Sequence, residues 1–208
     1  KSKYQTAAQY YYGHIAYSNN NYKTALEYFS KLDSSATFGP LVPYYITQMY
    51  FDQGKYQEAI DYAVPVLKNK SPQNNAEIMR IVAESYYRKG EYKNALVYFD
   101  GYSQATPVLS RDDRYTIGMC EFKGGNYTNA IAQFEKVIGP QDSIDQNAWY
   151  HLGASYLKEK NKTSARNAFE FASKSTYNPS ITELSLFNYA KLSYELKLPG
   201  GLNAFRNF

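Results

Sequence analysis

Apolar residues recur along this chain with the spacing of amphipathic helices, and no stretch of any length alternates as a strand does. Two kinds of helical run follow each other, with apolar residues at i, i+3 or i+4, and i+7. Two examples are Met79-Val82-Ala83-Tyr86 and Ala95-Phe99-Tyr102. Residues that end helices stand between the runs, namely Asn20, Gly54, Gly90 and Gly125. The pattern predicts pairs of helices joined by short turns.

One helical segment recurs five times along the chain. Its copies are Tyr22–Phe29, Tyr56–Ala63, Tyr92–Phe99, Tyr127–Phe134 and Lys162–Phe169. The fourth residue of each copy is an alanine, and the spacings from one alanine to the next are 34, 36, 35 and 35 residues. A further alanine, Ala204, follows 39 residues after Ala165, in a less regular segment. A constant period of this length predicts an array of helix–turn–helix repeats.

The residues at matching positions of each period resemble the tetratricopeptide repeat family. The fifth period is the fullest match, with Trp149, Leu152, Gly153, Tyr156, Ala165, Phe169 and Ala172. Departures from the family pattern are Ala16, Pro43, Glu121 and Lys162. The resemblance implies an all-α, right-handed superhelical solenoid. We expect repeats at 6–39, 40–75, 76–110, 111–145 and 146–184, and a partial or degenerate sixth at 185–208.

The composition of the chain argues against several classes of function and of binding site. The 23 basic residues exceed the 19 acidic ones by four, which is too small and too scattered an excess to favour nucleic acid. The single cysteine, Cys120, excludes an internal disulfide and a zinc cluster built from cysteines. No apolar run is long enough to predict a transmembrane segment. Tyrosine is unusually common, with 24 of 208 residues.

Candidate catalytic groups are few and isolated. His14 and His151 are separated by about four repeats and have no shared partner, so we expect each imidazole to face solvent or line a groove. The pair Asp112-Asp113 stands where a helix begins, and carboxylates there favour the helix dipole. No glycine-rich phosphate loop is present. We therefore expect no enzyme, no catalytic residues, no metal and no cofactor.

A second set of residues in each first helix is offset by one from the apolar core set and is expected to face the concave side of the array. Each first helix contributes a leading, a middle and a trailing residue to this set, which is here called the first-helix stripe. In this order, helix by helix, the stripe consists of Tyr10, His14, Tyr17, Tyr44, Gln48, Phe51, Arg80, Glu84, Tyr87, Tyr115, Met119, Phe122, Tyr150, Ala154 and Leu157. One interpretation is an aromatic groove for a peptide or helical segment of a partner, because tyrosine is enriched in interfaces. The other is that the rings only pack between neighbouring first helices.

The expected function is a non-catalytic scaffold that binds a protein or peptide. The resemblance argues against one kind of partner, the acidic C-terminus of cytosolic chaperones, because the middle stripe positions lack the basic residues that such a clamp requires. A structural spacer and a regulatory domain of a larger protein remain as alternatives, and the oligomeric state is open. Residues 186–192 resemble long repeat proteins of bacterial cell envelopes, so we expect a periplasmic or envelope location, with the cytoplasm as the alternative.

Overall fold

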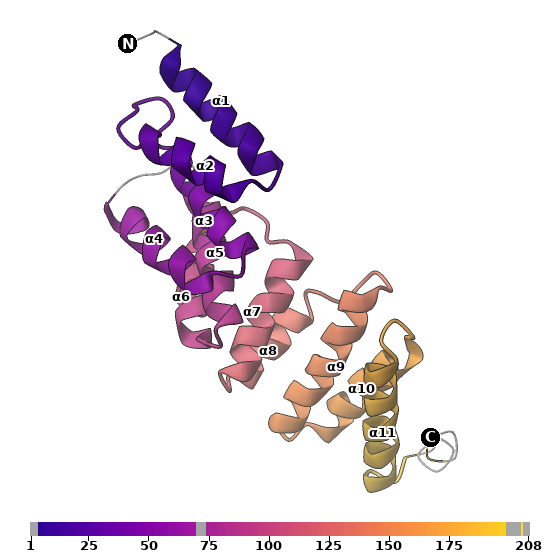
Figure 1. The fold of residues 1–208 in the computed structure, drawn as a ribbon. Coiled ribbons are helices and arrows are strands. Elements are labelled where there is room, and N and C mark those ends of the chain that lie inside the picture. The colour runs from indigo at the N-terminus through magenta and orange to yellow at the C-terminus, as the bar shows by residue number, and fades with distance from the viewer. Residues whose placement is uncertain (1–3, 70–73, 199–204, 206–208) are drawn as a thin grey trace. The chain divides into compact units, whose positions relative to one another are not determined.

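The protein is described here by a computed structural model that covers residues 4–69, 74–198 and 205. Every regular element in these ranges is helical (Figure 1). The helices are α1 (Gln5–Ser18), α2 (Tyr22–Phe29), the 3-10 turn η1 (Ser30–Leu32), α3 (Val42–Asp52), α4 (Tyr56–Asn69), α5 (Asn75–Arg88), α6 (Tyr92–Ala105), α7 (Arg111–Lys123), α8 (Tyr127–Phe134), α9 (Ser143–Lys158), α10 (Lys162–Lys174) and α11 (Pro179–Glu195). The all-α, repeated helix–turn–helix fold expected from the sequence is confirmed.

The chain forms two compact units, unit 1 (Lys1–Pro107) and unit 2 (Val108–Phe208). In unit 1 the hairpins α1–α2, α3–α4 and α5–α6 follow one another, and α5 packs against both helices of the hairpin before it. In unit 2 the hairpins α7–α8 and α9–α10 are followed by α11, which packs mainly on α10 (Figure 1). Each unit therefore repeats the same contact between a hairpin and the next first helix.

The turns inside the hairpins use a left-handed residue. The four turn residues expected from the sequence have positive φ: Asn20 (57°), Gly54 (70°), Gly90 (76°) and Gly125 (85°). In the turn after α3, the Lys55 amide donates to the Tyr50 carbonyl oxygen at 2.9 Å, the long bond that closes a Schellman motif. The corresponding residue after α9 is Lys160, at φ 60°, which no glycine or asparagine signal marks in the sequence.

The repeat alanines line the core, and in four of the five hairpins a phenylalanine four residues later fills it, whereas the second hairpin has Ala63 at that position. All five alanines are fully buried, at positions 25, 59, 95, 130 and 165. The small residues of the first helices face this phenylalanine, because a Cβ added to Gly118 would lie 2.8 Å from the ring of Phe134. Gly153 has the same relation to Phe169, at 3.0 Å. A small residue is thus needed in the first helix because a ring from the second helix occupies the space.

The expected repeat boundaries at 146 and 185 fall several residues inside helices. Residue 146 lies in α9, which begins at Ser143 because the Asp142 side chain accepts a hydrogen bond from the Asp145 amide at 2.8 Å. Residue 185 lies in α11, which begins at Pro179 after the capping side chain of Asn178. In both places a local cap determines where the helix starts. Residues 199–204 and 206–208, in the expected sixth repeat, lie outside the described residues.

Candidate functional site

The structure places the first-helix stripe on α1, α3 and α5 of unit 1 and on α7 and α9 of unit 2. All of its members are partly buried except Met119, which is buried. The core residues of the same helices, such as Val82 and Leu152, are almost completely covered. The stripe is therefore a distinct, partly accessible face of the first helices in each unit.

Leading tyrosines of the stripe are partly buried, and their rings contact aromatic residues of neighbouring elements. The Tyr10 ring stacks on Phe38 with centroids 4.6 Å apart, and its hydroxyl lies 3.3 Å from that of Tyr45 on the next first helix. Tyr150 meets the ring of the core residue Phe169 at 5.8 Å. At these leading positions the rings fill space around neighbouring helices, the second of the two interpretations given above.

The trailing aromatic residues form a repeated pair that the sequence analysis missed. Each trailing ring contacts the tyrosine that begins the second helix, five residues later. The pairs are Tyr17–Tyr22 (6.3 Å), Phe51–Tyr56 (5.4 Å), Tyr87–Tyr92 (6.1 Å) and Phe122–Tyr127 (5.6 Å). Both members of every pair are only partly buried. The five-residue spacing is visible in the sequence, and it is interrupted only at the fifth period, where Leu157 and Lys162 replace the rings.

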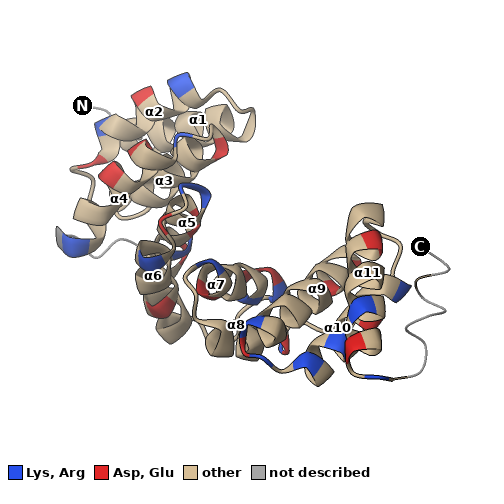
Figure 2. Ribbon diagram, turned by 90° about the horizontal axis from the view of Figure 1, so that it is seen from below, with Lys and Arg blue, Asp and Glu red and all other residues tan. Residues whose placement is uncertain are grey.

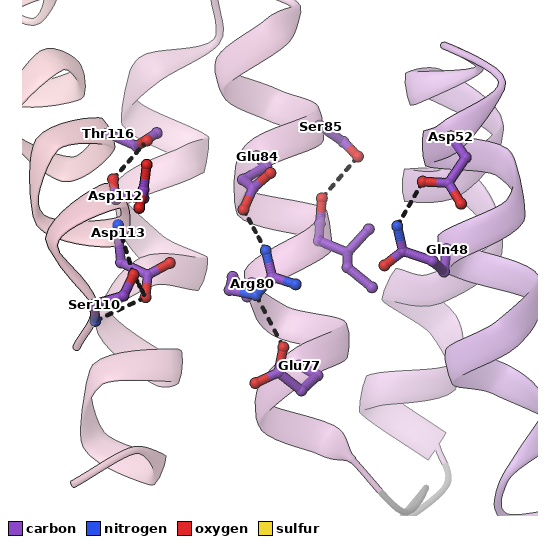
Figure 3. Close-up of polar contacts among 11 residues, drawn as sticks. Gln48, Asp52, Glu77, Arg80, Glu84, Ser85, Ser110, Asp112, Asp113 and Thr116 are labelled. Carbon is purple, nitrogen blue, oxygen red and sulfur yellow. Dashed lines mark hydrogen bonds and ion pairs between the residues drawn. The ribbon is translucent and has the colours of Figure 1, made fainter. Parts of the chain in front are cut away.

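The middle of the stripe is polar in unit 1 and apolar in unit 2. On α3, the Gln48 amide donates to Asp52 Oδ1 at 2.7 Å. On α5, Arg80 lies between two carboxylates and donates to Glu77 at 2.9 Å and to Glu84 (Figure 3). Burial opposes the charged form of Arg80, but the hydrogen bond to Glu77 and the charge of Glu84 raise its pKa above the ordinary value.

His151 is enclosed by aromatic rings, and the expectation of a simple solvent-facing or groove-lining imidazole is too coarse. Its ring centroid lies between 5.2 and 6.0 Å from those of four neighbours: Tyr115, Phe122, Phe134 and Tyr150. Its Nδ1 is 2.9 Å from the Asn147 carbonyl oxygen, one turn earlier in α9. Desolvation lowers the pKa of His151, and the positive charge of Lys123 acts in the same direction, although the Asn147 hydrogen bond opposes both.

This lowered pKa predicts a pH-dependent stability of unit 2. The unfolded chain binds the His151 proton more tightly than the folded chain, so the stabilisation is complete above the ordinary pKa of about 6.5. It is lost as the pH falls from there through the lower folded pKa. Urea unfolding between pH 5 and 8 should show that the unfolding free energy falls more steeply toward acid pH in the wild type than in His151→Gln. Equal dependence of the two unfolding free energies on pH would contradict the enclosure of His151.

Other candidate chemical groups have structural roles. Asp113 forms a capping box at the start of α7, accepting from the Ser110 amide at 3.1 Å and from its hydroxyl at 2.6 Å (Figure 3). This placement at a helix start agrees with the expectation for the Asp112-Asp113 pair. Cys120 is fully buried, and desolvation raises the pKa of its thiol to about 12, so thiolate chemistry is strongly disfavoured there.

The described residues offer neither a metal site nor a helix that could cross a membrane. No group of three or more His, Cys, Asp or Glu side chains converges within these ranges. None of their helices is both long enough and apolar enough to span a bilayer. Figure 2 shows basic and acidic residues interspersed over the helices of each unit.

A second aromatic surface lies outside the stripe, in unit 2. Trp149 is only partly buried and stacks on Phe171, with ring centroids 4.5 Å apart. Phe171 is 50% exposed. Two hollows of about 480 and 410 Å³ adjoin the pair, and both are lined by Trp149, Phe171 and Ile138. We call this the Trp149–Phe171 surface. It is the main alternative to the first-helix stripe as a candidate binding site.

Comparison with solved structures supports the fold. The protein MamA of AMB-1 has a TM-score of 0.69 and 15% identity, over 83% of this chain and 92% of that one. The C-terminal part of a TPR repeat-containing protein from Cytophaga hutchinsonii has a TM-score of 0.64 and 21% identity, over 88% of this chain and 70% of that one. At such low identities the likeness concerns the fold alone. A search of curated proteins gave no match.

The sequence also matches a family model described as tetratricopeptide repeat. The matched segments are residues 48–108 and 115–174, which together make up more than half of the chain. They include the hairpin α5–α6 of unit 1 and, from residue 115 of α7 onward, the hairpins α7–α8 and α9–α10 of unit 2, with their buried alanines and phenylalanines. The chain therefore belongs to the tetratricopeptide repeat family.

Proposed function

We propose that this protein is a non-catalytic scaffold that binds an extended or helical segment of a partner protein on the first-helix stripe. Tetratricopeptide repeats generally mediate protein–protein interaction, and their fold is generally not catalytic. The observation that carries the proposal is the trailing aromatic pair, which recurs in four successive hairpins with both rings partly accessible.

A partly buried ring can still contribute binding free energy when a partner covers it. A tyrosine or phenylalanine offers a large area and loses little rotamer freedom when a partner covers it. The trailing rings are already held against a second ring, so their orientation is fixed before binding. Recurrence of the pair from one hairpin to the next in unit 1 suits a partner segment that presents side chains at intervals, either extended or helical.

The test pairs changes in the stripe with a change on a second helix. A peptide selected from a displayed library against the whole chain serves as the probe. Phe51→Ala and Tyr87→Ala, both in unit 1, should each weaken the binding of a peptide that uses this unit at least about tenfold, the cost of losing a central anchor. The helical circular-dichroism signal should be unchanged. Lys93→Glu, at an exposed position of α6, is the matched control and should change binding little.

Two outcomes would contradict the proposal. If Phe171→Ala abolishes binding while both stripe changes are silent, the binding site is the Trp149–Phe171 surface. If no selected peptide depends on any stripe residue, the array acts as a spacer or as a regulatory domain, and its first helices serve packing alone.

A further inference from the structure

Large side chains lie exposed along one face of α1. Tyr4, Tyr11, Tyr12 and Ile15 are between 55% and 71% exposed, and the small Ala8 among them is exposed as well. Their spacings of three, four and seven residues place these five side chains on one side of the helix. We call them the outer face of α1, and none of them belongs to the first-helix stripe.

The fold covers the same face in later first helices. The residues of α3, α5 and α9 at the repeat positions of Ala8, Tyr12 and Ile15 are at most 6% exposed. They are Val42, Ile46 and Met49, then Ile78, Val82 and Ser85, then Ala148, Leu152 and Ser155. In α5, Ile78 and Val82 pack with Ile60 and Ala63 of α4, the second helix of the preceding hairpin. This side of a first helix is therefore built to receive another helix, and on α1 it lies exposed.

The outer face of α1 carries no charge that would repel a second copy of itself. The helix reads QTAAQYYYGHIAYS, without Asp, Glu, Lys or Arg. Two such faces can therefore come together without repulsion between like charges and without taking an ion out of water. The tyrosine hydroxyls stand at the ends of large rings, so they can stay hydrated at the rim while the rings are covered.

The order of large and small residues makes this face self-complementary. In an antiparallel pair of α1 helices whose twofold axis passes between residues 9 and 10, Tyr4 of one copy faces Ile15 of the other. Near the axis, Tyr11 of one copy then faces the small Ala8 of the other. A twofold pair makes each of these contacts twice, because the same patch is used on both copies. Rings thus meet alanines near the axis, and a tyrosine meets an isoleucine at each end.

The accessible area of the outer face is enough for a weak dimer. A fully exposed tyrosine side chain offers about 200 Å², so the exposed fractions amount to about 500 Å² on each copy. Two copies would bury up to about 1,000 Å² in total, which is the lower limit for a specific protein–protein interface. A contiguous exposed patch of this size on one helix is also typical of an interaction surface.

We infer that two copies of this chain associate through the outer faces of their α1 helices, packed antiparallel about a twofold axis. The dimer is weak and depends on concentration, because the buried area is at the lower limit for a specific interface. The stripe residues Tyr10, His14 and Tyr17 lie on another side of α1, so the inference does not rest on the proposed function. A dimer formed in this way leaves the first-helix stripe of each copy open to a partner.

Sedimentation equilibrium of the whole chain tests the association. The average mass should approach that of a dimer at about 500 µM and that of a monomer at about 5 µM. Ile15→Lys should raise the dissociation constant at least about tenfold, because the dimer would enclose two ammonium groups. Val97→Lys, at a 67% exposed position of α6, is the matched control and should leave the dissociation constant unchanged. Lysine forms helices at least as well as isoleucine or valine, so both variants should keep the wild-type circular-dichroism melt.

A charge exchange between copies tests the antiparallel register. Tyr4→Glu and Ile15→Lys should each weaken association alone, whereas an equal mixture of the two variants should form dimers again, because the introduced carboxylate of one copy faces the introduced ammonium of the other. A mixture that stays monomeric would overturn the antiparallel pairing. A wild-type chain that is monomeric at about 500 µM, a mass that grows beyond that of a dimer, or equal effects of Ile15→Lys and Val97→Lys would overturn the association through α1.

Discussion

Replacing Phe134 with alanine is expected to destabilise unit 2 by about 3–5 kcal/mol, the usual cost of removing a fully buried phenylalanine. The Phe134 ring is completely buried and touches elements from two hairpins. It lies against Gly118 of α7, whose added Cβ would be 2.8 Å away, and its centroid is 5.8 Å from that of His151 on α9. The cavity left by alanine is bounded by packed helices that cannot close over it without moving.

Urea unfolding followed by circular dichroism measures this loss, and Phe171→Ala is the matched control in the same unit. Phe171 is 50% exposed and its main ring contact is Trp149, so its removal should cost about 1 kcal/mol. Similar losses for the two variants would mean that the phenylalanine after the repeat alanine does not form the core of the hairpin.

Gln146→Leu is expected to destabilise unit 2 by about 1–3 kcal/mol for each buried polar group that it leaves unpaired. The Gln146 side chain is completely buried. Its Nε2 donates to the Ser175 carbonyl oxygen at 2.8 Å and to Thr182 Oγ1 at 2.9 Å, while its Oε1 accepts from the Asn178 amide at 2.8 Å. One side chain of α9 thus forms hydrogen bonds with the backbone of the connection between α10 and α11. Leucine is similar to glutamine in size but can form none of these hydrogen bonds.

Hydrogen exchange measures the loss in unfolding free energy and also shows which part of the chain the Gln146→Leu change affects. Amides of residues 172–182 should exchange faster in Gln146→Leu, because the connection loses its bonds to α9. Gln141→Leu, at an exposed position between α8 and α9, should leave that exchange unchanged. Unchanged protection in Gln146→Leu would show that the connection is held by packing alone.

Much of the fold is readable from the chain because it depends on local periodicity. The 34–36-residue spacing of the repeat alanines identifies the array, and all five alanines are buried. The turn residues at 20, 54, 90 and 125 adopt the left-handed conformation that their identity suggests. At α9 and α11 a single side chain, Asp142 or Asn178, caps the start of the helix, and the periodic pattern does not show where such a cap lies.

For the candidate site, the sequence predicts only which face of each first helix carries the residues. Periodicity identifies which residues share a side, and the stripe residues do lie on the first helices as expected. It does not say what covers them. Tyr10 meets Tyr45 from 35 residues away, and Tyr115 meets His151 from 36 residues away, with hydroxyl contacts of 3.3 Å in both cases.

The sequence by itself determined the helical repeat, its period, the family and the side of each first helix that carries the stripe. Only the tertiary structure decided which neighbours each of those rings contacts, and that His151 lies among four rings. The physical reason is that helical periodicity is a local property of a few turns. Coverage, burial and pKa depend instead on neighbours a full repeat away, whose side-chain sizes and orientations the period does not specify.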